Sequence, residues 1–181
     1  KITSNPVKFP GFRDAIEDAL ENGIVPCGVV TGLGTFTYED NSDCSRGKKL
    51  NSKKHKGDYR VGLVISNVEF QAGSFDMASC EKVCRLLDDC ARLKLPVIFF
   101  ISSAGMQTKE GGGSLFSMAV INERITRFVK DLDLPVVCFG FRDCTGGAQA
   151  SFVTHLLAKT YYFSGAQMPF AGQLVVESHL P

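Results

Sequence analysis

The chain carries at residues 97–106 the run Val97-Ile98-Phe99-Phe100-Ile101-Ser102-Ser103-Ala104-Gly105-Met106, in which an apolar strand gives way to a glycine-bearing turn. A second transition of this kind joins the apolar run 136–139 to Cys144-Thr145-Gly146-Gly147-Ala148. Strands that are apolar throughout are typical of parallel sheets, whose ligand sites lie beyond the carboxyl ends of the strands. Glycine lets the backbone approach a ligand closely, and a helix start leaves N–H groups unpaired. We therefore predict that each turn can act as an oxyanion hole built from backbone N–H groups.

Hydrophobic periodicity on either side of these turns predicts alternating strands and helices. We expect helices over residues 11–22, 74–94, 111–131 and 147–159, and strands over residues 25–38 (a strand or hairpin arm), 61–70, 96–101, 135–141 and 160–163. Two helical stripes are predicted to face the core: Met77, Cys80, Cys84, Leu87 and Ala91, and Leu115, Met118, Ile125, Phe128 and Leu132. This order is the pattern of an α/β fold with a parallel sheet and crossover helices.

Composition predicts a globular domain with neither a nucleic acid nor a membrane as partner. The chain has 181 residues, of which 44% are hydrophobic and 22% charged, and its net charge is +1. We expect residues 1–181 to form one domain of a larger protein, because the chain begins with lysine rather than methionine. A polar, basic loop insertion is expected over residues 39–58; its cations could meet ligand phosphates or simply form solvated surface. The seven cysteines form no Cys-x-x-Cys pair and are expected to be buried thiols, with no metal site.

Ser151 and His155 are the side chains to consider as catalytic residues of a serine hydrolase. Ser151 lies in the run Ala148-Gln149-Ala150-Ser151-Phe152, which resembles the serine environment of Clp proteases. The stretch 167–171, where the base of that family is expected, contains no histidine. We therefore interpret Ser151 as a helix-packing residue and His155 as a structural or surface residue.

Over residues 59–181 the sequence resembles the carboxyltransferase β subunit of bacterial acetyl-CoA carboxylase, a member of the crotonase and Clp protease superfamily. The motifs that carry the resemblance occur in the family's order: Phe70-Gln71-Ala72-Gly73-Ser74, Ile101-Ser102-Ser103-Ala104-Gly105-Met106-Gln107, Thr145-Gly146-Gly147-Ala148 and Pro169-Phe170-Ala171-Gly172. The resemblance implies a crotonase-type ββα spiral.

The activity that the resemblance implies is transfer of a carboxyl group from carboxybiotin to acetyl-CoA or another acyl-CoA. In that family the decarboxylated biotin takes the α-proton, so that no protein base is required and oxyanion holes stabilise the enolates. By motif, Gly105 and Met106 would face the thioester oxygen, and Gly146 and Gly147 would form the second turn. The implied substrate-binding residues are Ala104, Ala148, Phe170, Ala171 and Gly172.

The resemblance also implies the partners and the compartment. Biotin would be carried on a partner domain, with a CoA thioester as substrate and no metal in this chain. A biotin carboxyl carrier, a biotin carboxylase and a second carboxyltransferase-type domain, or further copies of this chain, would complete the assembly. The expected location is the cytoplasm, or the plastid stroma in a eukaryote.

Two alternatives remain open. Another crotonase-fold acyl-CoA enzyme (a hydratase, isomerase or thioesterase) would need a carboxylate near the first turn, and Glu110 is the best candidate, although its position also suits a helix N-terminus. A non-catalytic carboxyltransferase-like scaffold is the other. Its support is the single glycine of Ala104-Gly105-Met106, where the family usually carries paired glycines followed by Ala-Arg.

Overall fold

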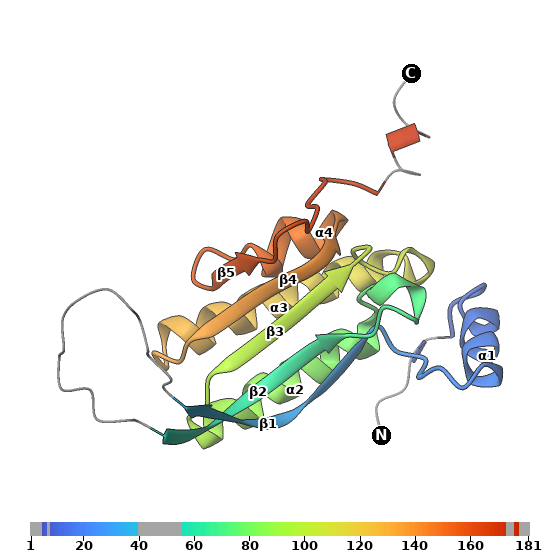
Figure 1. Cartoon of the computed structure of the whole chain (residues 1–181). Helices are drawn as coiled ribbons and strands as arrows, with labels where there is room; N and C mark the ends of the chain where they lie inside the picture. Colours follow the sequence, from blue (N-terminus) through green and yellow to red (C-terminus); the bar gives the residue numbers. More distant parts are fainter. Residues whose placement is uncertain (1–4, 7, 40–55, 173–175, 178–181) are drawn as a thin grey trace.

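Five strands form one sheet in the order β1-β2-β3-β4-β5. The computed structural model describes residues 5–6, 8–39, 56–172 and 176–177. The strands are β1 (Val29–Glu39), β2 (Lys56–Ser66), β3 (Val97–Ser103), β4 (Val136–Cys144) and β5 (Lys159–Tyr162). Strand β1 pairs antiparallel with β2, and the strands from β2 to β5 are parallel (Figure 1). The predicted α/β fold with parallel strands is confirmed. Of the predicted basic loop, residues 40–55 lie outside the described part.

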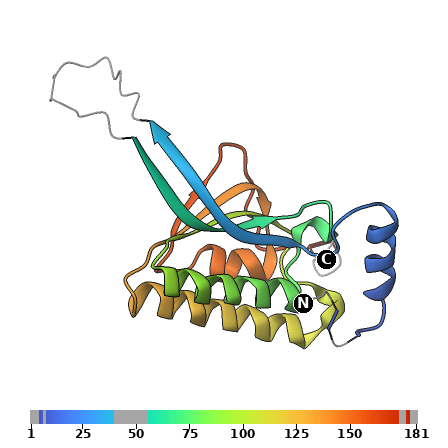
Figure 2. The ribbon, with the colours of Figure 1, turned by 90° about the horizontal axis from the view of Figure 1, so that it is seen from below.

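Helices lie between the parallel strands, and the two long ones cover one face of the sheet. The helices are α1 (Arg13–Glu21), which precedes β1, and α2 (Met77–Leu93), α3 (Gly112–Lys130) and α4 (Gly146–Ala148). Figure 2 shows α2 and α3 side by side beneath the sheet, with α1 at one end and the β1–β2 hairpin reaching away from the body. Helix α1 packs through Phe12 on Phe70, with ring centroids 6.0 Å apart. Among the described residues, we find no helix with the length and apolarity needed to cross a membrane.

The core lies between the sheet and helices α2 and α3. Its fully buried side chains come from all three elements: Val64, Phe99, Ile101, Val83, Leu87, Ile121 and Ile125. Burying each of them contributes about 1.5–3 kcal/mol. The predicted α2 stripe is confirmed at Cys80, Cys84 and Leu87, which are all buried.

The α3 stripe is wrong at its two ends. Leu115 and Leu132 are 56% and 50% exposed, whereas Ile125 and Phe128 are buried. Leu132 lies beyond the helix end at Lys130, so the helical period no longer directs it to the core. Leu115 lies in the first turn of α3 and faces a cavity described below.

The predicted helix over 147–159 is too long. Helix α4 passes into a π-helical turn, Gln149–Val153, and regular structure ends at Thr154, whose φ is −104° and ψ 27°. The Thr154 hydroxyl donates to the Gln149 carbonyl, five residues back, at 2.7 Å. A side chain that competes for backbone acceptors in this way favours helix termination. His155 therefore lies in a turn.

Candidate functional site

A cavity of about 500 Å³ lies at the carboxyl ends of β3 and β4. Its lining carries no charged side chain and consists of Ala104, Met106, Thr108, Gly111, Ser114, Leu115, Gly146, Gly147, Ala150, Phe170, Ala171 and Gly172. All of the site residues named from the sequence line this cavity, except Gly105 and Ala148. Those two residues are buried behind the wall. The structure thus brings the two glycine turns and the 170–172 segment together.

The two turns are in backbone contact. Gly105 has φ +106°, and a Cβ atom there would lie 3.2 Å from the Thr145 carbonyl oxygen and 3.3 Å from the Gly147 nitrogen. Gly146 also has a positive φ, of +58°. The Thr145 N–H donates to the Ser103 carbonyl at 2.9 Å, which continues the β3–β4 pairing into the turns. Glycine at residue 105 is therefore required both by its dihedral angle and by the close approach.

In the first turn, one N–H group is left without an acceptor in the described part of the chain. The Gly105 N–H donates to the Ser103 hydroxyl at 3.1 Å. The Ala104 and Gln107 N–H groups donate to backbone carbonyls at 3.1 and 2.8 Å. Of the N–H groups in this turn, that of Met106 alone has no acceptor among the described residues, and Met106 lines the cavity. The predicted Gly105–Met106 donor pair is thus reduced to Met106, because a serine side chain turns back onto Gly105.

The second turn has the same division between a paired and an unpaired amide. The Gly146 N–H donates to the Phe170 carbonyl at 3.0 Å, which ties the 170–172 segment to the turn. Gly147, the next residue of α4, finds no acceptor for its N–H within the described ranges. N–H groups in the first turn of a helix have no intrahelical partner. Met106 and Gly147 therefore each present one available donor at the cavity wall.

The first turn is fixed to the segment that precedes α2. The Phe75 N–H donates to the Gly105 carbonyl at 2.9 Å, and the Gln107 N–H donates to the Phe75 carbonyl at 2.8 Å. These two bonds form an isolated parallel bridge between Phe75 and Met106. The Phe75 side chain is fully buried and packs on Phe152, with ring centroids 4.7 Å apart. The position of Met106 is therefore set by the start of α2.

Neither Ser151 nor His155 lines this cavity. The Ser151 hydroxyl donates to the Gly147 carbonyl one turn back, as a packing residue of a helix does. The His155 Nδ1 accepts from the Leu157 N–H at 3.2 Å, so its Nε2 carries the proton and faces the Thr126 hydroxyl at 3.0 Å. Burial lowers the pKa of His155, against a smaller raising effect from a backbone hydrogen bond. The ring is held neutral at a distance from the turns.

Glu110 also points away from the cavity. It is fully buried, and its Oε2 accepts from the Met77 N–H, at the start of α2, at 2.6 Å. Burial raises the pKa of the Glu110 carboxyl; the Met77 hydrogen bond lowers it, and the charge of Asp76 raises it further. The carboxylate considered as a base from the sequence therefore does not line the site.

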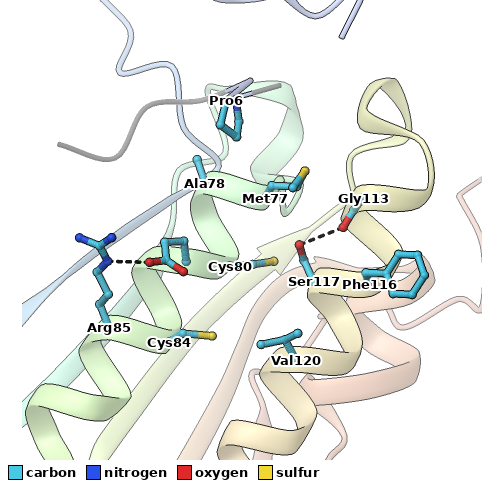
Figure 3. A pocket seen from close by; sticks show the side chains of 11 residues that line it. Pro6, Met77, Ala78, Cys80, Cys84, Arg85, Gly113, Phe116, Ser117 and Val120 are labelled. Atoms are coloured by element: carbon cyan, nitrogen blue, oxygen red, sulfur yellow. Dashed lines mark hydrogen bonds and ion pairs between the residues drawn. The ribbon is translucent and has the colours of Figure 1, made fainter. Parts of the chain in front are cut away.

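A second cavity, of about 550 Å³, lies between α2 and α3 (Figure 3). The Cys80 and Cys84 thiols reach into it from α2, and an Arg85–Glu81 ion pair lies on the same helix. Burial raises the pKa of Cys84 to about 11 and that of Cys80 well above its usual value, so both stay protonated and unreactive near neutrality. Among the described residues, no group of three or more histidine, cysteine or acidic side chains could hold a metal ion.

Comparison with known proteins gives relatives over nearly the whole chain. No protein-family model matches it. The chain is 30% identical over 179 residues to the acetyl-coenzyme A carboxylase carboxyl transferase subunit beta of Clostridium kluyveri, a match that covers 96% of this chain and 52% of the relative. The likeness thus extends beyond the span from residue 59 that the motifs suggested. The chain spans about half the length of the relatives it matches.

Solved structures share the fold at lower identity. A malonate decarboxylase hetero-tetramer from Pseudomonas, in complex with malonate, matches with a TM-score of 0.64 and 19% identity, over 99% of this chain and 59% of that one. Transcarboxylase 12S, with hydrolysed methylmalonyl-coenzyme A bound, matches with a TM-score of 0.60 and 20% identity, over 90% of this chain and 27% of that one. The crotonase-type fold expected from the motifs is confirmed. This chain is therefore a homologue of the carboxyltransferase β subunits of acetyl-CoA carboxylase.

Proposed function

We propose that this chain catalyses carboxyl transfer from carboxybiotin to acetyl-CoA or another acyl-CoA. The observation that carries the proposal is the pair of available amides, Met106 and Gly147, on two touching turns at the wall of one uncharged cavity. Backbone donors of this kind stabilise an oxygen that becomes negative in the transition state. A volume of about 500 Å³ is within the usual range for a small-molecule site.

Carboxybiotin, held on a partner domain, would supply both CO₂ and the base for the α-proton. The cavity fits such a group, because an uncharged wall suits a neutral ureido ring and leaves the proton transfer to it. The part of this chain is to hold the thioester and to stabilise its oxygen as the α-proton leaves. In the proposed arrangement the Met106 and Gly147 N–H groups donate to that oxygen, while Leu115 and Phe170 contact the acyl group. Each such donor contributes about 10²–10³-fold in kcat.

The structure disfavours the hydratase, isomerase or thioesterase alternative. Such chemistry needs a side-chain acid or base within hydrogen-bond reach of the substrate. The described residues that line the cavity include no histidine and no carboxylate, and Glu110 is buried against α2 instead. Among the alternatives, the scaffold gains support from one observation, since the Gly105 amide is already occupied by the Ser103 hydroxyl.

The partners are also part of the proposal. Two of the solved structures that share the fold are a hetero-tetramer and a hexamer, so an assembly of subunits is supported in general terms. We infer that a second carboxyltransferase-type domain or further copies of this chain close the cavity, and that a biotin carboxyl carrier and a biotin carboxylase supply the carboxyl group.

A pair of variants at Met106 tests the proposed donor. Met106→Ala and Met106→Pro both remove the side chain, and only the proline variant also lacks the N–H group. In the full-length protein with its partner subunit, malonyl-CoA-dependent carboxylation of free biotin is measured for both. We expect the proline variant to lose about 10²–10³-fold more kcat than the alanine variant. Unfolding midpoints, measured in parallel, separate a folding defect from loss of the donor. Equal kcat values for the two folded variants would show that the Met106 N–H group is not a catalytic donor. Absence of turnover by the wild type would favour the non-catalytic scaffold.

A further inference from the structure

Two carboxyl groups are buried at the first turn of α2. Asp76 is 1% exposed and its Oδ1 caps the helix by accepting from the Ser79 N–H at 2.6 Å. Glu110 is fully buried and accepts from the Met77 N–H at the same helix end. The other oxygen of each group, Asp76 Oδ2 and Glu110 Oε1, is buried with no hydrogen-bond partner in the described part of the chain. Buried polar atoms are nearly always paired, so this pair of oxygens requires an explanation.

Both carboxyl groups follow the backbone contact that holds the first turn, one on each of the two segments that make it. Phe75, which precedes Asp76, is bonded to Gly105 and Gln107. Glu110 ends the 3-10 turn Thr108–Glu110 that follows, and its side chain returns to Met77. The segment from 75 to 77 is thus tied to the segment from 105 to 110 at its beginning and at its end. Met106, the available donor at the cavity, lies within the first of these ties, between Gly105 and Gln107.

We propose that Glu110 is a positioning residue for the first turn, and that it holds a proton which its Oε1 donates to Oδ2 of Asp76. One shared proton then pairs both buried oxygens. The Oδ1 atom of Asp76 already accepts from the Ser79 N–H, so its Oδ2 atom is left to accept from Glu110. Two ionised carboxylates in this dry site would repel each other and separate α2 from the loop.

Within the described ranges, no cationic side chain forms an ion pair with Asp76 or Glu110. The Lys109 ammonium group, next to Glu110 in sequence, is exposed and directed to the Gln71 side chain at 3.3 Å. On α2, the Cys80 thiol interacts with both Asp76 and Glu110, and burial keeps its pKa well above the usual value. The Cys27 thiol contacts the Ser79 hydroxyl at 3.3 Å. The start of α3, residues 111–114, contributes glycines and a serine. The direction of the Glu110 pKa, which burial raises, agrees with a protonated carboxyl.

A proton held by Glu110 gives the pH dependence of the folding stability a definite sign. The pKa of Glu110 is raised in the folded state above the value of about 4.3 that glutamate has in unfolded chains. The folded state therefore binds more protons, and stability falls as the pH rises from that value through the raised folded pKa. Below the unfolded pKa the stabilisation is fully present.

Glu110→Gln is the variant that tests this. A glutamine can accept from the Met77 N–H with its oxygen and donate to Asp76 with its amide, at every pH. In the full-length protein, we expect the urea midpoint of the wild type to fall as the pH rises from about 4.3 through the raised pKa of Glu110. The urea midpoint of Glu110→Gln should show a smaller fall over the same pH range. Glu69→Gln, at an exposed glutamate, is the matched control and should keep the wild-type pH dependence. An unchanged pH dependence in Glu110→Gln, or its failure to fold, would overturn the shared proton.

Turnover tests the positioning role, which rests on the proposed function. Glu110→Ala should lower kcat about tenfold or more, because the first turn is then tied at one end only, and Glu110→Gln should restore most of it. The wild-type kcat should fall at high pH and that of Glu110→Gln should not. A Glu110→Ala variant that folds and retains the wild-type kcat would refute positioning. If the wild type itself has no carboxyltransferase activity, the proposed function fails, whereas the unfolding data still decide whether the proton is shared.

Discussion

Replacing Gly105 by alanine tests whether the backbone contact between the two turns matters for activity. An alanine at residue 105 would have to keep the φ of +106°, a backbone conformation that L-residues rarely adopt. Its Cβ would lie 3.2 Å from the Thr145 carbonyl oxygen and 3.3 Å from the Gly147 nitrogen. Both neighbours are backbone atoms of the second turn, so neither can rotate away. The turns must therefore move apart by a few tenths of an ångström, which displaces the Met106 and Gly147 amides relative to each other.

The size of the effect follows from two separate costs. Holding alanine at this dihedral angle costs about 1–3 kcal/mol of folding free energy. Crowding against Thr145 and Gly147 adds to it. Gly165→Ala is the matched control, because Gly165 also has a positive φ, of +87°, but a Cβ there meets no atom within 4 Å. The control carries the dihedral strain without the contact.

The assay combines urea unfolding with malonyl-CoA-dependent carboxylation of biotin by the assembled protein. We expect Gly165→Ala to lower the free energy of unfolding by about 1–3 kcal/mol and to keep its kcat. Gly105→Ala should lose more stability, and its kcat should fall about 10²-fold through misplacement of the donors. If a folded Gly105→Ala variant has the same kcat as Gly165→Ala, the contact between the turns does not position the donors.

Three further substitutions test other parts of the site and the fold. Ser103→Ala removes the acceptor of the Gly105 N–H and frees a second donor in the first turn, so kcat should rise at a stability cost of about 1 kcal/mol; an unchanged kcat in steady-state assays contradicts this. Phe170→Ala, at a side chain that is 85% exposed, should shift the free energy of unfolding by less than about 0.5 kcal/mol, while the KM for acyl-CoA rises. Gly62→Ala places a Cβ 2.4 Å from a buried thiol sulfur and should cost about 1–3 kcal/mol in urea unfolding. Its control Gly32→Ala, where a Cβ meets nothing within 4 Å, should change stability by less than about 0.5 kcal/mol.

The sheet could be predicted from the sequence because its signals are local. The run 97–101 is apolar at every position, and the structure buries Val97, Phe99 and Ile101 completely under the helices. A strand followed by a helical period fixes the direction of the next strand, so the parallel order of β2 to β5 follows without knowledge of any long-range contact. The end of the helix predicted over residues 147–159 could not be read from the sequence, because it depends on the Thr154 hydroxyl, which donates to a carbonyl five residues back.

The contents of the site were less predictable, because they depend on contacts between segments far apart in the chain. A glycine turn at the end of a strand indicates that amides are present, but which amides are available is decided elsewhere: the Ser103 hydroxyl occupies that of Gly105, and the Phe170 carbonyl occupies that of Gly146. Glu110 shows the same limit, since its position before a glycine-rich helix start suits a base as well as a helix cap. Only its bond to the Met77 N–H, across 33 residues, directs the carboxyl away from the cavity. Activity in this protein should therefore respond to substitutions that alter which backbone amides are paired, even where no catalytic side chain is touched.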